Sequence, residues 1–179
     1  MRHRSPTLAF FLWGLVCFLS LPLIHYFQNL YFEKKEPLFI CAVPNQNGQA
    51  SLRSDGYGIG YFGASRNGGR IHQGIDLLAA VGKPVYAAKS GRVVFAGGDN
   101  KGYGQHIEVL HPNGFRTLYA HLSSLNIKQK DWVRQGEVIG KTGKTGNAKS
   151  HNILPHLHFE VRDQKKAINP APFLNYKLV

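Results

Sequence analysis

Residues 106–122 read HIEVLHPNGFRTLYAHL, two apolar stretches separated by the turn Pro112-Asn113-Gly114. Asn and Gly adopt positive φ at little cost, so this turn between two strand-like stretches is typical of a β-hairpin. The second stretch alternates in character residue by residue, as the two faces of a strand do. We therefore predict an antiparallel pair formed by residues 106–111 and 115–122.

The chain on either side of this hairpin has the same character, because glycine is frequent and the apolar runs are short. No stretch after residue 50 keeps the apolar period of a helix over three turns. Further strands are expected at residues 84–89 (PVYAAK), 91–97 (GRVVFAG), 137–143 (EVIGKTG) and 156–162 (HLHFEVR). The sequence predicts an all-β, mainly antiparallel fold, a compact sandwich or barrel.

An apolar stretch without charge, TLAFFLWGLVCFLSLPLI, occupies residues 7–24. As a helix rising ~1.5 Å per residue it would span roughly 27 Å, close to the thickness of a bilayer core. Arg2 and Arg4 precede it, so the positive-inside rule keeps the N-terminus in the cytoplasm and exports the rest. We expect a single-pass transmembrane helix in the cytoplasmic membrane. A cleaved signal peptide and secretion are the alternative, although no A-x-A-like site follows the stretch.

The length leaves room for one ordinary domain besides this segment. We assign residues 1–27 to the anchor, 28–50 to a linker and 51–179 to the domain. The linker mixes Pro, Asn, Gln and charged residues, although its apolar patch LFICAV at 38–43 could instead form a first strand. One of the two cysteines lies in the apolar stretch, so cysteines cannot cross-link the domain. A core, with or without a metal, must stabilise it.

The chain is basic, with 22 Lys and Arg against 10 Asp and Glu. An excess of about ten positive charges remains in the exported part, which suits an anionic polymer or an acidic lipid face, or only keeps the domain soluble. Nucleic acid fits least, because an exported domain seldom meets it and no recognition motif is present. We expect no nucleic-acid partner.

The nine histidines include a pair in the segment PHLHFEV, residues 155–161. The period of two places His156, His158 and Glu160 on one face of a strand and the apolar residues on the other. The two imidazoles would be roughly 6.6 Å apart along the strand and could face one cleft. One ring could bind a metal while the other reaches a water molecule beside it, although two surface histidines would give the same pattern.

A second group lies in RIHQGIDLLAA, where His72 and Asp76 are four residues apart. On a straight strand they would be ~13 Å apart, too far to bind one ion. Gly74 lies between them and could supply the bend that closes this distance. His72, Asp76 and His158 would then offer two imidazoles and a carboxylate with a fourth position open, as in a catalytic zinc site.

A third group is YAHL, residues 119–122, where His121 follows the predicted hairpin and shares a strand face with Tyr119. Histidine is the side chain whose ordinary pKa lies nearest neutrality, so His121 is a candidate for proton transfer. Taken alone, a structural or solvent-facing histidine explains the position better.

These three groups, H-x-G-x-D at 72–76, Y-A-H-L at 119–122 and P-H-L-H-F-E-V at 155–161, occur in that order. Together they resemble the lysostaphin and LytM type of peptidoglycan endopeptidase, metallopeptidase family 23, over about residues 56–172. The resemblance implies the LytM-type β fold. It implies one Zn²⁺ per chain, held by His72, Asp76 and His158, with His121 and His156 beside the metal-bound water.

The resemblance also implies a substrate and a reaction, hydrolysis of the peptide cross-links of peptidoglycan. Either His121 or His156 would be the general base, and the sequence does not decide between them. We expect the enzyme to act as a monomer on the outer side of the bacterial membrane. A non-catalytic scaffold that regulates cell-wall amidases is the alternative function, although such relatives characteristically lose a ligand position and none is lost here.

One departure from the family is a longer loop before the PHLHFEV strand, GNAKSHNIL at residues 146–154. We expect this loop to shape the substrate groove and its His151 to be solvated. The bond that is cut, a glycyl bridge or a D-amino-acid cross-link, stays open.

Overall fold

The computed structural model describes residues 22–24, 26–45, 47, 49–66, 68–98 and 101–179. It divides the chain into two compact units, Met1–Pro37 and Leu38–Val179. In the first unit the described residues 22–24 and 26–35 are helical. The second unit holds every strand of the described chain.

The second unit consists of short strands and two 3₁₀ helices. In chain order they are β1 (Ser54–Asp55), β2 (Gly58–Ile59), β3 (Ser65–Arg66), β4 (Arg70–Ile71), β5 (Ile75–Leu78), β6 (Pro84–Tyr86), β7 (Gly91–Gly97), β8 (His106–Leu110), β9 (Phe115–Ala120), β10 (Leu122–Leu125), β11 (Trp132–Val133), β12 (Val138–Thr142), η1 (Gly146–Lys149), β13 (His156–Asp163), β14 (Lys166–Ile168) and η2 (Ala171–Phe173).

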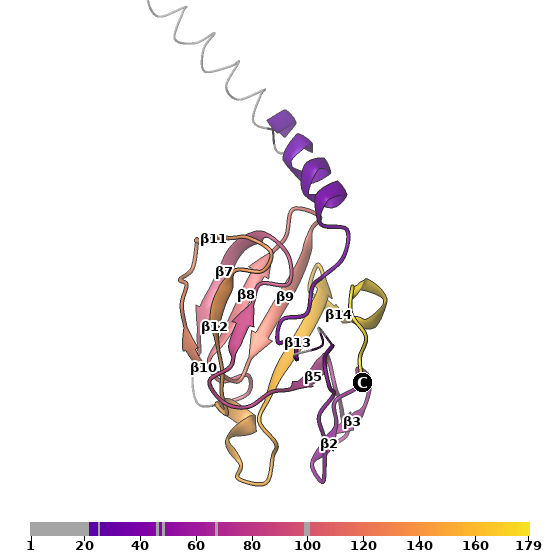
Figure 1. Ribbon diagram of the computed structural model, residues 1–179, viewed down its shortest axis with the longest axis vertical. Coiled ribbons are helices and arrows are strands. Elements are labelled where there is room, and N and C mark those ends of the chain that lie inside the picture. Colours follow the sequence, from indigo (N-terminus) through magenta and orange to yellow (C-terminus); the bar gives the residue numbers. More distant parts are fainter. Residues whose placement is uncertain (1–21, 25, 46, 48, 67, 99–100) are drawn as a thin grey trace, which may run out of the picture. The chain divides into compact units, whose positions relative to one another are not determined.

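A seven-stranded sheet forms the main layer, in the order β11-β7-β8-β9-β13-β14, with β5 also paired to β13 (Figure 1). All of its strand pairs within the described residues are antiparallel. The hairpin of β8 and β9 turns at Gly114, whose φ of 86° is the left-handed conformation that glycine allows. The predicted antiparallel β fold is confirmed.

A smaller sheet, in the order β10-β12-β6, packs against the large sheet through the contact of β10 with β8 (Figure 1). Its Leu122, Val85 and Ile139 belong to one buried cluster with Ile107 and Val109 of β8. Apolar side chains from alternate positions of both sheets therefore form a single core.

The predicted strands agree with the observed ones to within a few residues, and 91–97 coincides with β7. The largest difference falls at residue 121, because the stretch predicted as one strand over 115–122 is divided there. His121 has a φ of 63°, which interrupts β9 and starts β10 in the other sheet. Left-handed backbone at a non-glycine residue cannot be read from the alternation of side chains.

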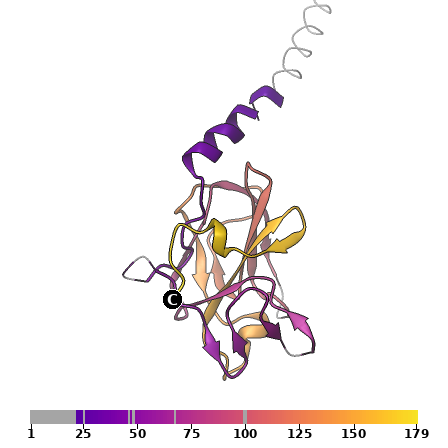
Figure 2. The same cartoon turned by 90° about the vertical axis from the view of Figure 1, so that its right-hand side faces the viewer.

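Several residues of the stretch that we expected as the linker pack into the domain instead. Phe39, Ala42, Val43 and Ala50 are buried in the core, and Phe39 and Ala50 form single parallel bridges to Leu174 and Leu178. The beginning and the end of this unit therefore lie side by side (Figure 2). The apolar patch at 38–43 contributes to the core rather than to a tether, although only Phe39 within it pairs as a strand does.

The anchor predicted over residues 7–24 lies outside the described residues except for 22–24. Within the described part of the chain, no helix is both long and apolar enough to cross a membrane. Of the two cysteines, the described one, Cys41, is buried and not disulfide-bonded.

Candidate active site

Three sequence groups meet on β13, because this strand pairs with β5 on one side and with β9 on the other. The register with β5 places Asp76 directly opposite His158. The register with β9 places Ala120 opposite the same residue, so that His121 follows immediately. Residues far apart in the sequence are thus brought to one point by sheet pairing alone.

His72 reaches Asp76 because the chain bends at Gly74 between β4 and β5. A Cβ at Gly74 would lie 2.4 Å from the carbonyl oxygen of Phe159 and 2.8 Å from Cγ of Glu160. Only glycine therefore allows this segment to pass so close to β13. The His72 Nε2 atom lies 2.9 Å from Asp76 Oδ1, far less than the ~13 Å of a straight strand.

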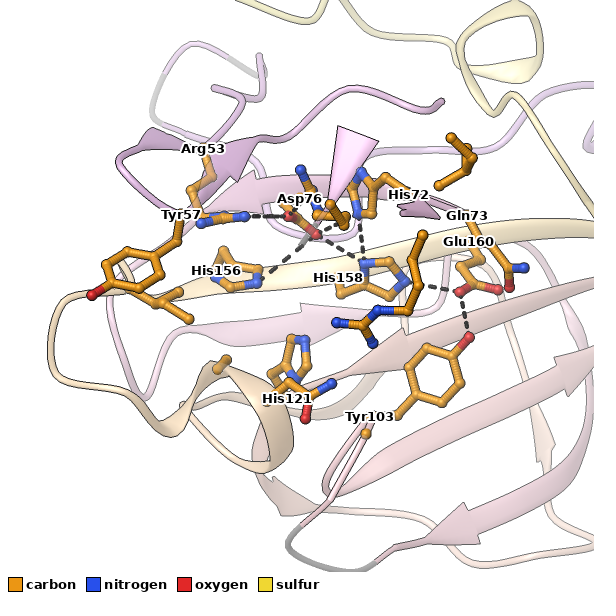
Figure 3. A pocket seen from close by; sticks show the side chains of 17 residues that line it. Arg53, Tyr57, His72, Gln73, Asp76, Tyr103, His121, His156, His158 and Glu160 are labelled. Carbon is orange, nitrogen blue, oxygen red and sulfur yellow. Dashed lines mark hydrogen bonds and ion pairs between the residues drawn. The ribbon is translucent and has the colours of Figure 1, made fainter. Parts of the chain in front are cut away.

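The three side chains bring two nitrogens and one oxygen to a common point. His158 Nδ1 lies 2.8 Å from Asp76 Oδ1 and 3.0 Å from His72 Nε2. All three residues are buried, and their potential ligand atoms lie within 4.8 Å of one another. Figure 3 shows Asp76 beside the rings of His72 and His158. This is the donor set that a transition-metal ion such as zinc prefers.

The second nitrogen of each ring fixes which atom is available for a metal. His72 Nδ1 donates to the carbonyl oxygen of Tyr61 at 2.7 Å, since a carbonyl can only accept. His158 Nε2 donates to Glu160 Oε1 at 2.9 Å. In the neutral rings, the lone pairs of His72 Nε2 and His158 Nδ1 therefore face Asp76 Oδ1. Three lone pairs so close together require a positive charge among them, so the residues fit a bound cation.

The electrostatics of the cluster agree with that requirement. Burial alone raises the pKa of Asp76, but hydrogen bonding with the rings of His158 and His72 outweighs it and holds this pKa far below its usual range. For His158, burial lowers the pKa, and hydrogen bonds to Asp76 and Glu160 outweigh it and raise the pKa to about 9. Without a metal, the site thus attracts a proton to the place that a cation would take.

His121 and His156 lie beside this cluster, and a backbone carbonyl holds the Nδ1 atom of each ring. His121 Nδ1 donates to the carbonyl of Thr145 at 2.9 Å, and His156 Nδ1 donates to that of Leu154 at 2.7 Å. Each ring therefore keeps its Nε2 as the acceptor, and His156 Nε2 lies 3.8 Å from Asp76 Oδ1. The two ring centroids are 5.1 Å apart (Figure 3).

The pKa of each of these histidines lies below the ordinary histidine value, which favours the neutral ring. Burial and then the charges of His158 and His156 lower the pKa of His121 to about 3. Burial likewise lowers the pKa of His156, against the attraction of Asp76. His121 also has the left-handed backbone described above, a strained conformation that is common at functional sites. Neutral imidazoles with a free Nε2 can accept a proton from a water molecule.

A cavity of about 830 Å³ opens over the cluster, within the size range of ligand pockets. The five residues proposed from the sequence all line it. The longer loop before β13 contributes Asn147, Ala148 and Ile153 to the wall, as expected for a loop that shapes the groove. His151 on that loop is exposed and does not line the cavity, as predicted.

Several residues of the site were not found from the sequence. Arg53 donates from Nε and Nη2 to Asp76 Oδ2, at 3.2 and 3.0 Å, and Arg66 donates from Nη2 to the same oxygen at 2.9 Å. Tyr103 donates to Glu160 Oε1 at 2.7 Å and stacks on His158. The alternation of β13 did place Glu160 on the face of the two histidines, which was the one available signal. Arg53 lies at the edge of the supposed linker, where no pattern marked it.

Comparisons with known proteins agree with this geometry. A family model described as peptidase family M23 matches residues 70–170. Lysostaphin from Staphylococcus staphylolyticus is 40% identical over 124 residues, which are 66% of this chain and 25% of lysostaphin. The DD-carboxypeptidase/endopeptidase Mpg of Neisseria meningitidis is 45% identical over 102 residues, 57% of this chain and 22% of Mpg. The murein hydrolase activator NlpD of Salmonella typhimurium is 35% identical over 121 residues, 68% of this chain and 30% of NlpD. The chain thus spans less than a third of each of these relatives.

Two solved structures share the fold. The catalytic domain of the antimicrobial peptidase lysostaphin from Staphylococcus simulans superposes with a TM-score of 0.54 at 38% identity, covering 67% of this chain and 90% of that domain. A zinc-containing peptidase from Vibrio cholerae gives a TM-score of 0.59 at 25% identity, covering 74% of this chain and 39% of that one.

Proposed function

The chain belongs to peptidase family M23, and from this we propose that it is a zinc-dependent endopeptidase that hydrolyses the peptide cross-links of bacterial peptidoglycan. The observation that carries the proposal is the convergence of His72 Nε2, Asp76 Oδ1 and His158 Nδ1 at the floor of a cavity. His121 and His156 line the same cavity with their acceptor nitrogens available. Metal ligands and proton acceptors are thus combined in one site.

His72, Asp76 and His158 would hold one zinc ion per chain. Two imidazole nitrogens and one carboxylate oxygen leave one position of a tetrahedral ion open, as in catalytic rather than structural zinc sites. The zinc-containing peptidase of Vibrio cholerae, which shares the fold, supports this choice of metal. When bound, the ion supplies Lewis acidity, which polarises a scissile carbonyl and makes an attacking water molecule more acidic.

His121 and His156 are the residues that we assign to proton transfer. Backbone carbonyls hold the proton of each ring on Nδ1, so Nε2 can accept the proton of the attacking water. Once protonated, the same imidazole can donate a hydrogen bond to the oxyanion or return the proton to the departing amine. One of the two rings is the base and the other stabilises the charge that develops.

Endopeptidase activity is supported by the similarity to a protein described as a DD-carboxypeptidase/endopeptidase and to lysostaphin, described as a peptidase. A second function is favoured by a different observation, the 35% identity to a murein hydrolase activator. In that role the domain would bind an amidase without cutting any bond. The complete set of potential zinc ligands argues for the enzyme, because a binding scaffold has no need of a metal with an open position.

The test uses the purified chain with and without zinc. Zinc content is measured by atomic absorption, and purified peptidoglycan is digested and its fragments weighed by mass spectrometry. We expect about one zinc per chain and newly released peptide ends, both lost in His158→Ala and both kept in His151→Ala, which changes an exposed histidine. Digestion by zinc-free protein would reject the dependence on zinc. Zinc binding without any cleavage would reject the enzyme and leave the activator.

We further propose that residues 7–24 anchor the enzyme in the cytoplasmic membrane, with the domain outside it. The uncharged apolar sequence and the arginines that precede it support this arrangement. The strongly basic composition suits an anionic wall polymer. Fractionation of cells that express the full chain tests the anchor: recovery in the soluble fraction after export would show instead that the segment is removed.

A further inference from the structure

The hairpin of β3 and β4 carries two arginines opposite each other at the cavity wall. The register pairs Arg66 with Arg70, and both residues line the cavity that contains the histidine cluster. Like charges that face each other across two strands are destabilising, by an amount similar to the gain from an opposite-charge pair. An anion bound between them would reverse the sign of this interaction.

The carboxylate nearest to Arg66 is already shared. Asp76 Oδ2 accepts from Arg66 Nη2 at 2.9 Å and from Arg53 Nη2 at 3.0 Å. Arg53 has a carboxylate of its own in addition, because its Nη1 lies 2.7 Å from both oxygens of Asp55. The other hydrogen bond of Arg66, from Nη1 to the carbonyl of Ile59 at 2.8 Å, brings no negative charge.

Arg53 has Asp55 in addition to its share of Asp76, whereas Arg66 has only its share of Asp76. The guanidinium of Arg66 is thus less well neutralised than that of Arg53. It is also the more accessible of the two, with 15% of its side chain exposed against 4%. A ligand in the cavity can therefore reach Arg66.

The balance of charged residues around the cavity also favours a negatively charged ligand. Its charged lining residues are the three arginines 53, 66 and 70 against the two acids Asp76 and Glu160. A divalent cation bound to the histidine cluster would add two further positive charges. It would also be neutralised in part by Asp76, the carboxylate that Arg53 and Arg66 already share. Such a site favours a substrate that carries negative charge close to the reacting bond.

We propose that Arg66 and Arg70 form a subsite for a carboxylate group of the peptide substrate. The inference rests on the endopeptidase function proposed above and specifies its substrate. A cross-link between D-amino acids, in which a free carboxylate lies beside the scissile bond, fits this subsite. A glycyl bridge carries no charge along its length and offers the two arginines nothing to bind.

The test compares two purified stem-peptide dimers joined through a D-amino acid, identical except that the carboxylate beside the cross-link is free in one and a primary amide in the other. The zinc-loaded full chain should cleave the free-carboxylate dimer with a kcat/KM roughly 10- to 100-fold higher, the value of a hydrogen bond to a charged group. Arg66→Gln and Arg70→Gln should each bring this ratio toward one, mainly through KM. Arg134→Gln, which changes an exposed arginine outside the cavity, should keep the full ratio.

The ratio of kcat/KM for the two dimers separates a loss of substrate binding from damage to the metal site. A loss of zinc in Arg66→Gln would lower kcat/KM for both dimers by the same factor and leave the ratio unchanged. Binding is also measured by calorimetry in a zinc-loaded His121→Asn protein, where the carboxylate dimer should bind more tightly and Arg66→Gln should remove the difference. Equal cleavage of both dimers by the unchanged chain, or an unchanged ratio in both arginine variants, overturns the subsite and leaves the endopeptidase intact. Cleavage of neither dimer, with no cleavage of peptidoglycan, rejects both proposals.

Discussion

Glu160 Oε1 lies 2.9 Å from His158 Nε2, on the side of the imidazole ring that faces away from Asp76. Glu160 is fully buried and is itself held by Tyr103, at 2.7 Å, and by Arg162 Nε, at 2.7 Å from Oε2. The ring of His158 is therefore fixed between two carboxylates. A histidine held in this way presents its other nitrogen to a metal in a defined direction.

Replacing Glu160 with Gln should weaken zinc binding by about 10- to 100-fold, the usual effect of changing such a partner of a ligand histidine. Gln has nearly the same shape, so the core around it should persist, but the negative charge that favours the bound cation is lost. Competition with a chelator of known affinity measures the constant. Glu137→Gln, at an exposed position, is the matched control. Equal zinc affinity in the two variants would show that Glu160 only fills space.

His121→Asn should lower turnover by roughly 10²- to 10⁴-fold while zinc content stays the same, because we assign this residue to proton transfer and not to metal binding. Asn is preferred over Ala because it tolerates the positive φ of this position. His156→Gln is compared with it in the same assay, and the larger loss in kcat identifies the base. A variant that loses zinc together with turnover would place that histidine among the ligands instead.

His111 should make the stability of the domain depend on pH. Burial lowers its pKa to about 4, although the hydrogen bond to the carbonyl of Ser90 raises it. The unfolded chain, with an ordinary histidine pKa of about 6.5, binds the proton more readily, so stability is complete above that value and is lost as the pH falls toward 4. The contribution is on the order of 3 kcal/mol.

Urea denaturation at pH 7.5 and 5 measures this effect as a difference between variants. His111→Gln should show a smaller fall in the free energy of unfolding than the unchanged chain, because the residue that must bury a charge is gone. His151→Gln, at an exposed histidine, should behave as the unchanged chain does. The prediction fails if all three proteins lose the same free energy between the two pH values.

Phe39→Ala should lower the free energy of unfolding by about 3–5 kcal/mol, the usual cost of removing a buried aromatic ring. The ring packs against His111, Phe115 and Phe173, and only 2% of the residue is exposed. Leu38→Ala, at a position that is 40% exposed, should change stability by no more than about 0.5 kcal/mol. Similar losses of unfolding free energy in the two variants would indicate that residues 38–50 act as a linker after all.

The fold could be predicted from the sequence where one signal repeated along the chain. Short apolar runs and the Pro-Asn-Gly turn identified β7 and β8, and alternation identified β9 and β13. The short strands β1 to β4 have no face in the core, since most of their residues are partly or fully exposed. The role of residues 38–50 depends on contacts with the far end of the chain, which no local pattern contains.

The residues of the candidate site likewise fall into those that the sequence could indicate and those that only the fold reveals. Residue type and the spacing along β13 selected His156 and His158, and the need for a bend led to Gly74. Arg53, Arg66 and Tyr103 could not be selected, because arginine and tyrosine occur throughout the chain and only the fold brings these three to Asp76 and Glu160. Sequence motifs thus indicate the atoms that bind or react, whereas the residues that orient them depend on tertiary structure.

The central claim is that His72, Asp76 and His158 bind one zinc ion, and anomalous diffraction at the zinc absorption edge from crystals of the zinc-loaded chain tests it most directly. We predict a single peak at about 2.0–2.2 Å from His72 Nε2, from His158 Nδ1 and from one oxygen of Asp76. A peak bound to other residues, or none in zinc-saturated crystals, would contradict it.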